Sequence, residues 1–339
     1  MSSGRRRGGG SRGPALTGRA LGGLIFIVMV LAAIVAAILY AGPGPRTGQP
    51  TDVVLDRGMS TGGIGTALKS AGVIRSRAVF MIMSHVGGGS LKAGEYSFAS
   101  GESMSAVIAD LKAGRVVRHF VTVPEGWTSA VAAQAVTASP VLVGEAPVPP
   151  EGSLLPETYE VRRGEDRAKV IARMQADQSA LLAQLWARRR PDLPYRSPQE
   201  AVTLASIVEK ETGLPAERPR IAAVFLNRLK IGMRLESDPT VIYGVSKGAP
   251  LGRGLTVSEL AGETPYNTYK IVGLPPTPIA NPGKAALAAV LNPPQSDELY
   301  FVANGTGGHV FASTYAQHQA NVARWRQIEH ARVAAGAAK

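Results

Sequence analysis

Two glutamates in the middle of the chain combine the residue type and the surroundings that acid–base chemistry needs. Residues 205–213 are ASIVEKETG, an apolar run that ends in Glu209, Lys210 and Glu211. A carboxyl group beside apolar residues loses hydration, which raises its pKa toward neutral pH and suits it to general acid catalysis. The partial negative charge at the end of a helix also favours the protonated form. This pattern predicts a general acid at one of the two glutamates.

The helix that carries these glutamates does not choose between them. Residues 197–200, Ser-Pro-Gln-Glu, are typical of a helix start, and the helix is expected to run to Thr212 with Gly213 as its C-cap. At 100° per residue, Glu209 and Glu211 lie on opposite margins of the apolar face, so at most one can enter a given cleft. The alternative is that both glutamates simply cover the edge of the helix in water.

Two later stretches carry polar and aromatic side chains that suit a sugar ligand. Residues 234–244, RLESDPTVIYG, include an expected turn at Asp238-Pro239, and residues 263–283 are expected to form a loop. Aromatic rings stack on sugar faces, while amides and hydroxyls bind sugar hydroxyl groups. Ordinary loop formation is the alternative role for such residues. The predicted substrate contacts are Asp238, Tyr243, Asn267, Tyr269 and Asn281.

Several other kinds of chemistry find no support in the sequence. The chain has no cysteine, and its five histidines show no metal-ligand spacing such as HExxH. It also lacks a Ser-His-Asp order, a P-loop and a GxGxxG motif. We therefore expect neither a metal site nor another cofactor.

One apolar stretch predicts a membrane anchor. Residues 20–42 carry no charge and would form a helix of roughly 34 Å, enough to cross a bilayer. The run is longer than the apolar region of a cleaved signal peptide, which is the alternative. Five arginines in residues 1–19 precede it, so the positive-inside rule places that tail in the cytoplasm and the rest across the membrane. Because these arginines supply much of the net charge of +12, nucleic-acid binding is not expected.

The expected organisation is an α+β protein with five segments. They are a cytoplasmic tail (1–19), a transmembrane helix (20–42), a Pro- and Gly-rich linker (43–52), a small α+β module (53–123) and a larger α+β catalytic domain (124–339). In the small module, Ser76 and Ser103 are expected to start helices and Gly114 to end one. In the larger domain, the proline-rich loop 145–161 is expected either to shape a cleft or to serve as a plain connector.

Five motifs in this order resemble the endolytic murein transglycosylases, the YceG-like proteins of bacteria. They are EGSLLPETYEV, ASIVEKET, VFLNRLKIGMRLESDPTVIYG, TPYNTYKIVGLPPTPIANPG and LYFVANGTGGHVF. The resemblance covers about residues 53–330. It implies a lytic cut between N-acetylmuramic acid and N-acetylglucosamine in peptidoglycan that leaves 1,6-anhydro ends. In the family the catalytic residue is the second glutamate of E-K-E-T, which is Glu211 here.

The resemblance carries further expectations about the setting of this reaction. It implies that residues 53 to about 121 form a LysM-like, glycan-binding module. It also implies a single-pass protein of the bacterial inner membrane, with a periplasmic catalytic domain that ends nascent glycan strands beside membrane-bound peptidoglycan synthases. The alternative, from another functional class, is a non-catalytic glycan-binding scaffold that recruits those synthases.

Overall fold

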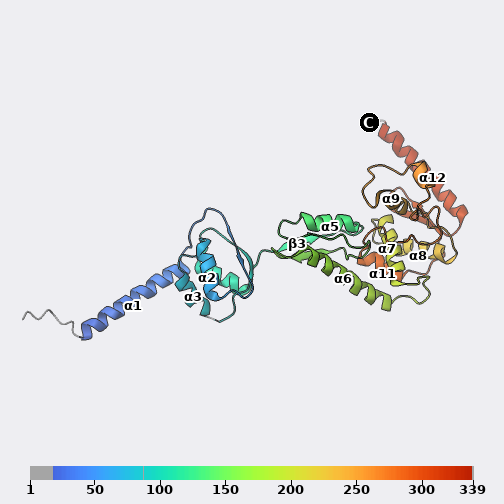
Figure 1. Ribbon diagram of the computed structural model, residues 1–339. Helices are drawn as coiled ribbons and strands as arrows, with labels where there is room; N and C mark the ends of the chain where they lie inside the picture. The colour runs from blue at the N-terminus through green and yellow to red at the C-terminus, as the bar shows by residue number, and fades with distance from the viewer. Residues whose placement is uncertain (1–17, 87, 338–339) are drawn as a thin grey trace, which may run out of the picture. The chain divides into compact units, whose positions relative to one another are not determined.

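The protein contains both helices and strands, as expected, and divides into two compact units. The computed structural model describes residues 18–86 and 88–337 (Figure 1). The first unit ends at Arg118 and the second begins at His119. The predicted arginine-rich tail lies outside the described residues, except for its last two positions. The mixture of helices and strands confirms the α+β class.

The first helix has the length and composition of a membrane span. Helix α1 (Gly18–Ala41) contains an uninterrupted apolar stretch, Leu21–Ala41, none of which is buried inside the protein. A long apolar helix without protein cover is consistent with a membrane anchor. Near the end of α1, Tyr40 packs against the core of the first unit.

The remainder of the first unit is a small domain in which a two-stranded sheet and three helices share one core. Its elements are β1 (Thr51–Leu55), α2 (Thr61–Ser70), α3 (Arg77–His85), β2 (Gly94–Phe98) and α4 (Met104–Ala113). Strands β1 and β2 pair antiparallel. Tyr96 and Phe98 of β2 and Phe80 of α3 are fully buried in the core. The predicted caps are confirmed: Ser76 and Ser103 accept hydrogen bonds at the helix starts, and Gly114 ends α4 with φ 73°.

The boundary between the units lies slightly earlier than the sequence suggested. Strand β3 (His119–Thr122) pairs antiparallel with β4 (Thr158–Val161), which belongs to the second unit. The second unit therefore begins at His119 rather than at residue 124. This partner lies about 40 residues away along the chain, so the local sequence pattern could not reveal it.

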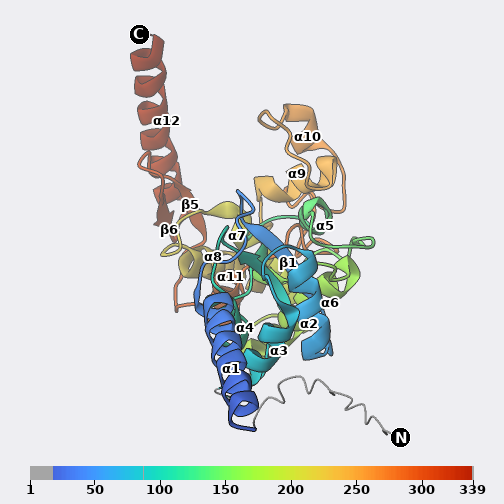
Figure 2. The same ribbon diagram turned by 90° about the vertical axis from the view of Figure 1, so that its left-hand side faces the viewer.

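The second unit is mostly helical. Its helices are α5 (Ser129–Ala138), α6 (Arg167–Ala187), α7 (Pro198–Glu211), α8 (Arg218–Lys230), α9 (Asp238–Ser246), α10 (Val257–Ala261), α11 (Lys284–Leu291) and α12 (Tyr315–Ala337). Strands β5 (Tyr300–Ala303) and β6 (His309–Ala312) form a hairpin against which α12 packs. The contacts reach as far as Arg332, which donates to the Gly305 carbonyl. Figure 2 shows α12 extending away from the body of this unit.

Helix α7 lies at the centre of the second unit, packed against α6, α8 and α11. Every residue from Ala201 to Glu209 is buried. A helix that is covered on all sides has no solvent face. Glu209 is therefore not at a solvent-exposed margin of the helix, and the alternative that it covers the helix edge in water is wrong.

Helix ends near the candidate site differ from the expectation at two places. Helix α7 ends at Glu211, and Thr212 leaves it in an extended conformation, so Gly213 is not the C-cap. Asp238-Pro239 is not a turn but the first two residues of α9, with Ser237 as the N-cap. Serine is favoured at the N-cap and proline in the first turn of a helix, so Ser237-Asp238-Pro239 is compatible with a helix start as well as with a turn.

Candidate active site

Glu211 is the last residue of α7 and is half-buried. Loss of hydration is the main reason why its pKa is raised to about 7. A hydrogen bond from the Ser237 hydroxyl to Oε1 opposes that rise. The negative charge of Asp238 raises the pKa further, whereas the positive charges of His309 and Arg228 lower it. Near neutral pH this carboxyl group can therefore both give and take a proton.

Ser237 is held in place by a small network of buried hydroxyl groups. Its backbone N–H donates to Thr268 Oγ1 at 2.9 Å, and the Thr240 hydroxyl donates to the Ser237 carbonyl at 2.6 Å. The hydroxyls of Thr240 and Thr268 are 2.8 Å apart. These contacts fix the start of α9 against the 263–283 loop, so the hydroxyl that meets Glu211 has a defined position.

Glu209 has a different role. Its Oε1 accepts a hydrogen bond from Arg218 Nη2 at 2.7 Å in a buried ion pair, and its Oε2 accepts one from the Gly283 N–H at 3.0 Å. Arg218 also contacts Glu125 Oε2 at 3.2 Å. Both oxygens of Glu209 are thus used to join α7 to α8 and to the start of α11. Burial raises the pKa of Glu209 as well, but its two oxygens are held in these contacts, which leaves Glu211 as the candidate for proton transfer.

His309, the first residue of β6, also belongs to this region. The backbone N–H of His309 donates to Glu217 Oε1 at 2.8 Å, and its ring Nδ1 lies 2.8 Å from Glu217 Oε2. Glu217 in turn accepts a hydrogen bond from the Thr212 hydroxyl at 3.3 Å. These contacts join the β5–β6 hairpin to the residue that follows Glu211.

The structure brings two of the predicted substrate contacts close to Glu211. The Tyr269 hydroxyl donates to Asp238 Oδ1 at 2.7 Å. Asp238 is exposed and Tyr269 is half-buried, and the charge of Glu211 contributes to the raised pKa of Tyr269. This pair lies beside the reactive carboxyl and has surface that a ligand can reach.

Asn267 and Asn281 are placed differently from the expectation, because both are fully buried. The Asn267 amide donates to the carbonyls of Leu260 and Gly262. The Asn281 Oδ1 accepts from the Leu154 N–H at 2.9 Å, and its Nδ2 donates to the Trp127 carbonyl at 3.0 Å. With no exposed surface, these two asparagines position loops rather than touch a substrate.

Tyr243, the remaining predicted contact, lies near the other end of α9. Its hydroxyl donates to Glu151 Oε2 at 3.3 Å, and its ring centroid is 5.0 Å from that of Tyr266. Glu151 Oε1 accepts from the Ser129 N–H at 2.8 Å. No local signal distinguishes Glu151, although this residue opens the EGSLLPETY motif. Its partners lie 22 and 92 residues away, which no local pattern can reveal.

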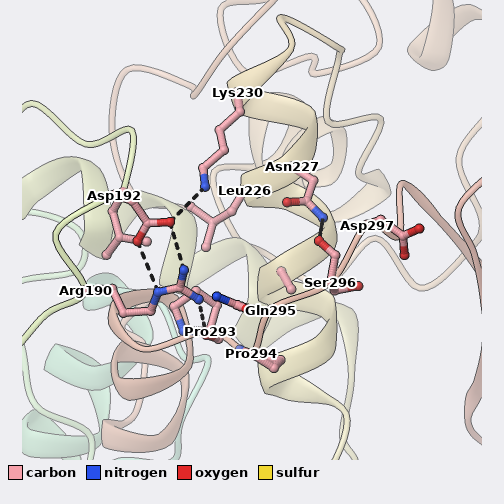
Figure 3. A pocket seen from close by; sticks show the side chains of 12 residues that line it. Arg190, Asp192, Leu226, Asn227, Lys230, Pro293, Pro294, Gln295, Ser296 and Asp297 are labelled. Atoms are coloured by element: carbon pink, nitrogen blue, oxygen red, sulfur yellow. Dashed lines mark hydrogen bonds and ion pairs between the residues drawn. The ribbon is translucent and has the colours of Figure 1, made fainter.

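A cavity of about 450 Å³ lies elsewhere in the second unit (Figure 3), and none of the site residues lines it. Figure 3 shows Arg190, Asp192 and Lys230 pointing toward one another. Arg190 and Lys230 both bind Asp192, at 2.8 and 3.4 Å. Because these charges are already paired, the cavity offers no reactive group comparable with Glu211.

The donor set of the described residues does not suggest a metal centre. Across residues 18–86 and 88–337, no group of three or more His, Cys, Asp or Glu side chains is arranged to hold an ion. The chemistry that these residues themselves support is proton transfer by Glu211.

A carboxyl group with a pKa near neutrality, beside a half-buried tyrosine and an exposed carboxylate, defines the class of enzymes that use general acid–base catalysis. The chain belongs to the YceG-like family, whose model matches residues 53–324. The family resemblance predicted from the five motifs is thereby confirmed.

Named relatives agree with this membership, and one solved structure is also similar to the chain. The chain is 29% identical over 300 residues to an endolytic murein transglycosylase of Bacillus subtilis, which covers 79% of this chain and 82% of the relative. It is 29% identical to an endolytic murein transglycosylase of Streptococcus pneumoniae over 80% of this chain and 57% of the relative. A YceG-like protein of Listeria monocytogenes has a solved structure with 29% identity and a TM-score of 0.49, covering 80% of this chain and 98% of that one.

Proposed function

We propose that the protein is a membrane-anchored lytic transglycosylase, a lyase that cuts peptidoglycan glycan strands internally between N-acetylmuramic acid and N-acetylglucosamine. The observation that carries this proposal is the carboxyl group of Glu211, whose pKa is raised to about 7. The names of the relatives support peptidoglycan as the substrate.

One carboxyl group suffices for this reaction if the sugar supplies its own nucleophile. Protonated Glu211 gives its proton to the glycosidic oxygen as the bond from that oxygen to C1 of the muramyl residue breaks. The resulting carboxylate then takes the proton of the C6 hydroxyl of the same residue, and O6 closes on C1. The product carries a 1,6-anhydro end, and Glu211 is protonated again for the next cycle. Ordinary glycosidases need a second carboxylate to attack C1 or to activate water.

The surroundings of Glu211 suit both halves of this cycle. The acid half needs a protonated carboxyl group, which loss of hydration and the charge of Asp238 favour. The base half needs a carboxylate, which the hydrogen bond from Ser237 stabilises. A pKa near the working pH makes both forms available.

The wider arrangement fits action on nascent glycan at the membrane. Helix α1 would anchor the protein, with the tail in the cytoplasm and residues 43–339 in the periplasm. In this proposal the small module after α1 is LysM-like and binds glycan, and the second unit cuts it. Cleavage beside membrane-bound synthases would end glycan polymerisation.

The rival proposal is a scaffold that binds glycan and recruits synthases without cleaving. A scaffold has no need for a carboxyl group with its pKa near 7, since that costs stability whenever the group is ionised. Glu211 therefore favours the enzyme.

Incubation of purified, uncross-linked glycan strands with residues 43–339 tests the proposal. Mass spectrometry should find 1,6-anhydro-muramyl ends with the wild-type fragment and with the exposed control Glu157→Gln, but not with Glu211→Gln. Retained glycan binding by Glu211→Gln would separate loss of the acid from loss of the fold. Full cleavage by Glu211→Gln would contradict the assignment of Glu211. No cleavage by a folded wild-type fragment would favour the scaffold.

A further inference from the structure

Lys247 occupies a backbone conformation that lysine rarely adopts. It is the C-cap of α9, with φ 53° and ψ 32°, in the left-handed region. Glycine or asparagine is the usual residue there, because a Cβ atom makes this conformation unfavourable. The cost of placing a lysine at this position points to a use for its side chain.

The ammonium group of Lys247 lies over a pair of tyrosine rings. Its Nζ is 4.6 Å from the ring centroid of Tyr266 and 5.8 Å from that of Tyr243. The lysine is exposed, and no carboxylate in the described part of the chain forms an ion pair with it. A cation over aromatic faces keeps its charge available to an anion that arrives from solvent.

The two tyrosines are held rigidly. The Tyr243 hydroxyl donates to Glu151 at 3.3 Å, and the Tyr266 hydroxyl lies 2.7 Å from Thr277 Oγ1. Each ring is thereby fixed at its outer end while its face remains half-buried. Fixed rings offer flat surfaces on which a sugar can stack at little cost in conformational entropy.

This cluster lies at the opposite end of α9 from Glu211. Ser237, just before α9, binds the Glu211 carboxyl group, and Lys247 follows the last residue of the helix. Lys247 lies nine positions after Asp238, which is about 14 Å along a helix. A glycan that runs along α9 from the reactive carboxyl would meet Lys247 beyond the bond that is cut.

We propose that Lys247, with Tyr243 and Tyr266, forms a subsite for a carboxylate-bearing muramyl residue away from the cleaved bond. The inference rests on the proposed function. The carboxylate belongs either to the peptide stem or, in stripped strands, to the lactyl group. The subsite makes the enzyme select muramyl strands over neutral glycans of similar backbone.

Binding and turnover with three kinds of strand test this subsite. They are strands with intact stems, strands with all carboxyl groups blocked as methylamides, and strands stripped of stems but keeping the lactyl carboxylate. On intact strands, Lys247→Met should raise KM about twofold to fivefold with kcat nearly unchanged, the effect expected for one exposed ion pair. Lys247→Arg keeps the positive charge and should have a KM close to that of the wild type. The control Lys169→Met, at an exposed lysine on α6, should have no effect.

The other two substrates identify the carboxylate. On blocked strands, wild type and Lys247→Met should have the same raised KM. On stripped strands, a remaining difference between them identifies the lactyl carboxylate, and its loss identifies the stem. An equal effect of Lys247→Met on intact and blocked strands, or no effect on either, would overturn the proposal.

Two further variants keep the test independent of folding and of cleavage. Lys247→Gly removes the side chain while relieving the backbone strain, so it should raise KM without lowering the melting temperature. Direct binding of strands to Glu211→Gln and to Glu211→Gln/Lys247→Met reports on the subsite even if the wild type proves not to cleave. Weaker binding of intact strands by the double variant, with no change for blocked strands, would support the subsite on its own.

Discussion

Glu209 and Glu211 are separated by one residue, yet their carboxyl groups have different partners. Glu209 is neutralised by Arg218 and by the Gly283 N–H. Glu211 has only the hydroxyl of Ser237 as a hydrogen-bond donor among the contacts described above. Their positions along α7 do not distinguish the two glutamates. The distinction comes from the neighbouring segments that contact each carboxyl group.

The two neighbours of Glu211 should move its activity profile in opposite directions. Ser237→Ala removes a hydrogen bond that lowers the pKa of Glu211, so the alkaline limb of kcat/KM should shift to higher pH. Asp238→Asn removes a negative charge that raises this pKa, so the same limb should shift to lower pH. Measurement of kcat/KM from pH 5 to 9 for both variants tests the two shifts. Shifts of the same sign, or a flat wild-type profile, would argue against Glu211 as the acid.

The same two glutamates should have opposite effects on stability. Because the pKa of Glu211 is raised to about 7, its ionisation costs folding free energy as the pH rises from about 4.5 to about 7, on the order of 3 kcal/mol above pH 7. Glu211→Gln should therefore stabilise the protein at pH 8 and have little effect at pH 4.5.

Glu209→Gln provides the comparison for that experiment. It leaves Arg218 with a weakened partner in a buried position, so it should destabilise the protein by about 3 kcal/mol at pH 8. Denaturant titrations at both pH values measure these effects. If Glu211→Gln destabilised the protein at pH 8 as Glu209→Gln does, Glu211 would also be a structural residue.

Among the helices and strands, the sequence predicted the features that depend on local signals. Ser76, Ser103 and Gly114 each cap a helix as expected, because capping depends on three or four neighbouring residues. Strand β4 and the all-round burial of α7 were not predicted, since both depend on partners far along the chain. The roles of Glu151 and His309 escaped prediction for the same reason.

Gly152 provides a test of how the EGSLLPETY loop is positioned. It has φ 76°, and a Cβ atom there would lie 2.6 Å from Pro278 Cγ and 3.0 Å from Val202 Cγ1. Gly152→Ala should therefore combine backbone strain with overpacking, at about 2–4 kcal/mol. Because Glu151 precedes it, turnover should fall as well.

Gly164→Ala is the matched control, since Gly164 has φ 78° and no atom within 4 Å of an added Cβ. It should cost only the strain of the left-handed conformation, about 1 kcal/mol. Equal losses of unfolding free energy in the two variants would contradict the close packing of this loop on α7 and on the 263–283 loop.

At the scale of the whole molecule, each compact unit has a hydrophobic core of its own. The second unit includes β3, in which Val121 is buried, and the next residue after the strand, Val123, which is buried as well. A fragment of residues 119–339 should thus fold alone and cleave glycan in a manner that depends on Glu211. Without residues 119–123, β4 loses its partner and two core valines are missing, so residues 124–339 should be less stable by about 3 kcal/mol or more. Equal melting temperatures would contradict the boundary at His119.

Cleavage of glycan strands by residues 43–339 in ¹⁸O-labelled water tests directly whether the C6 hydroxyl of the sugar, rather than water, attacks C1. If Glu211 acts alone and the C6 hydroxyl is the nucleophile, the new muramyl ends should be anhydro sugars without the label, and Glu211→Gln should form none. Reducing ends that carry ¹⁸O would show that water attacks. That result would contradict the single-carboxyl mechanism and make the neighbouring Asp238 the candidate for a second catalytic carboxylate.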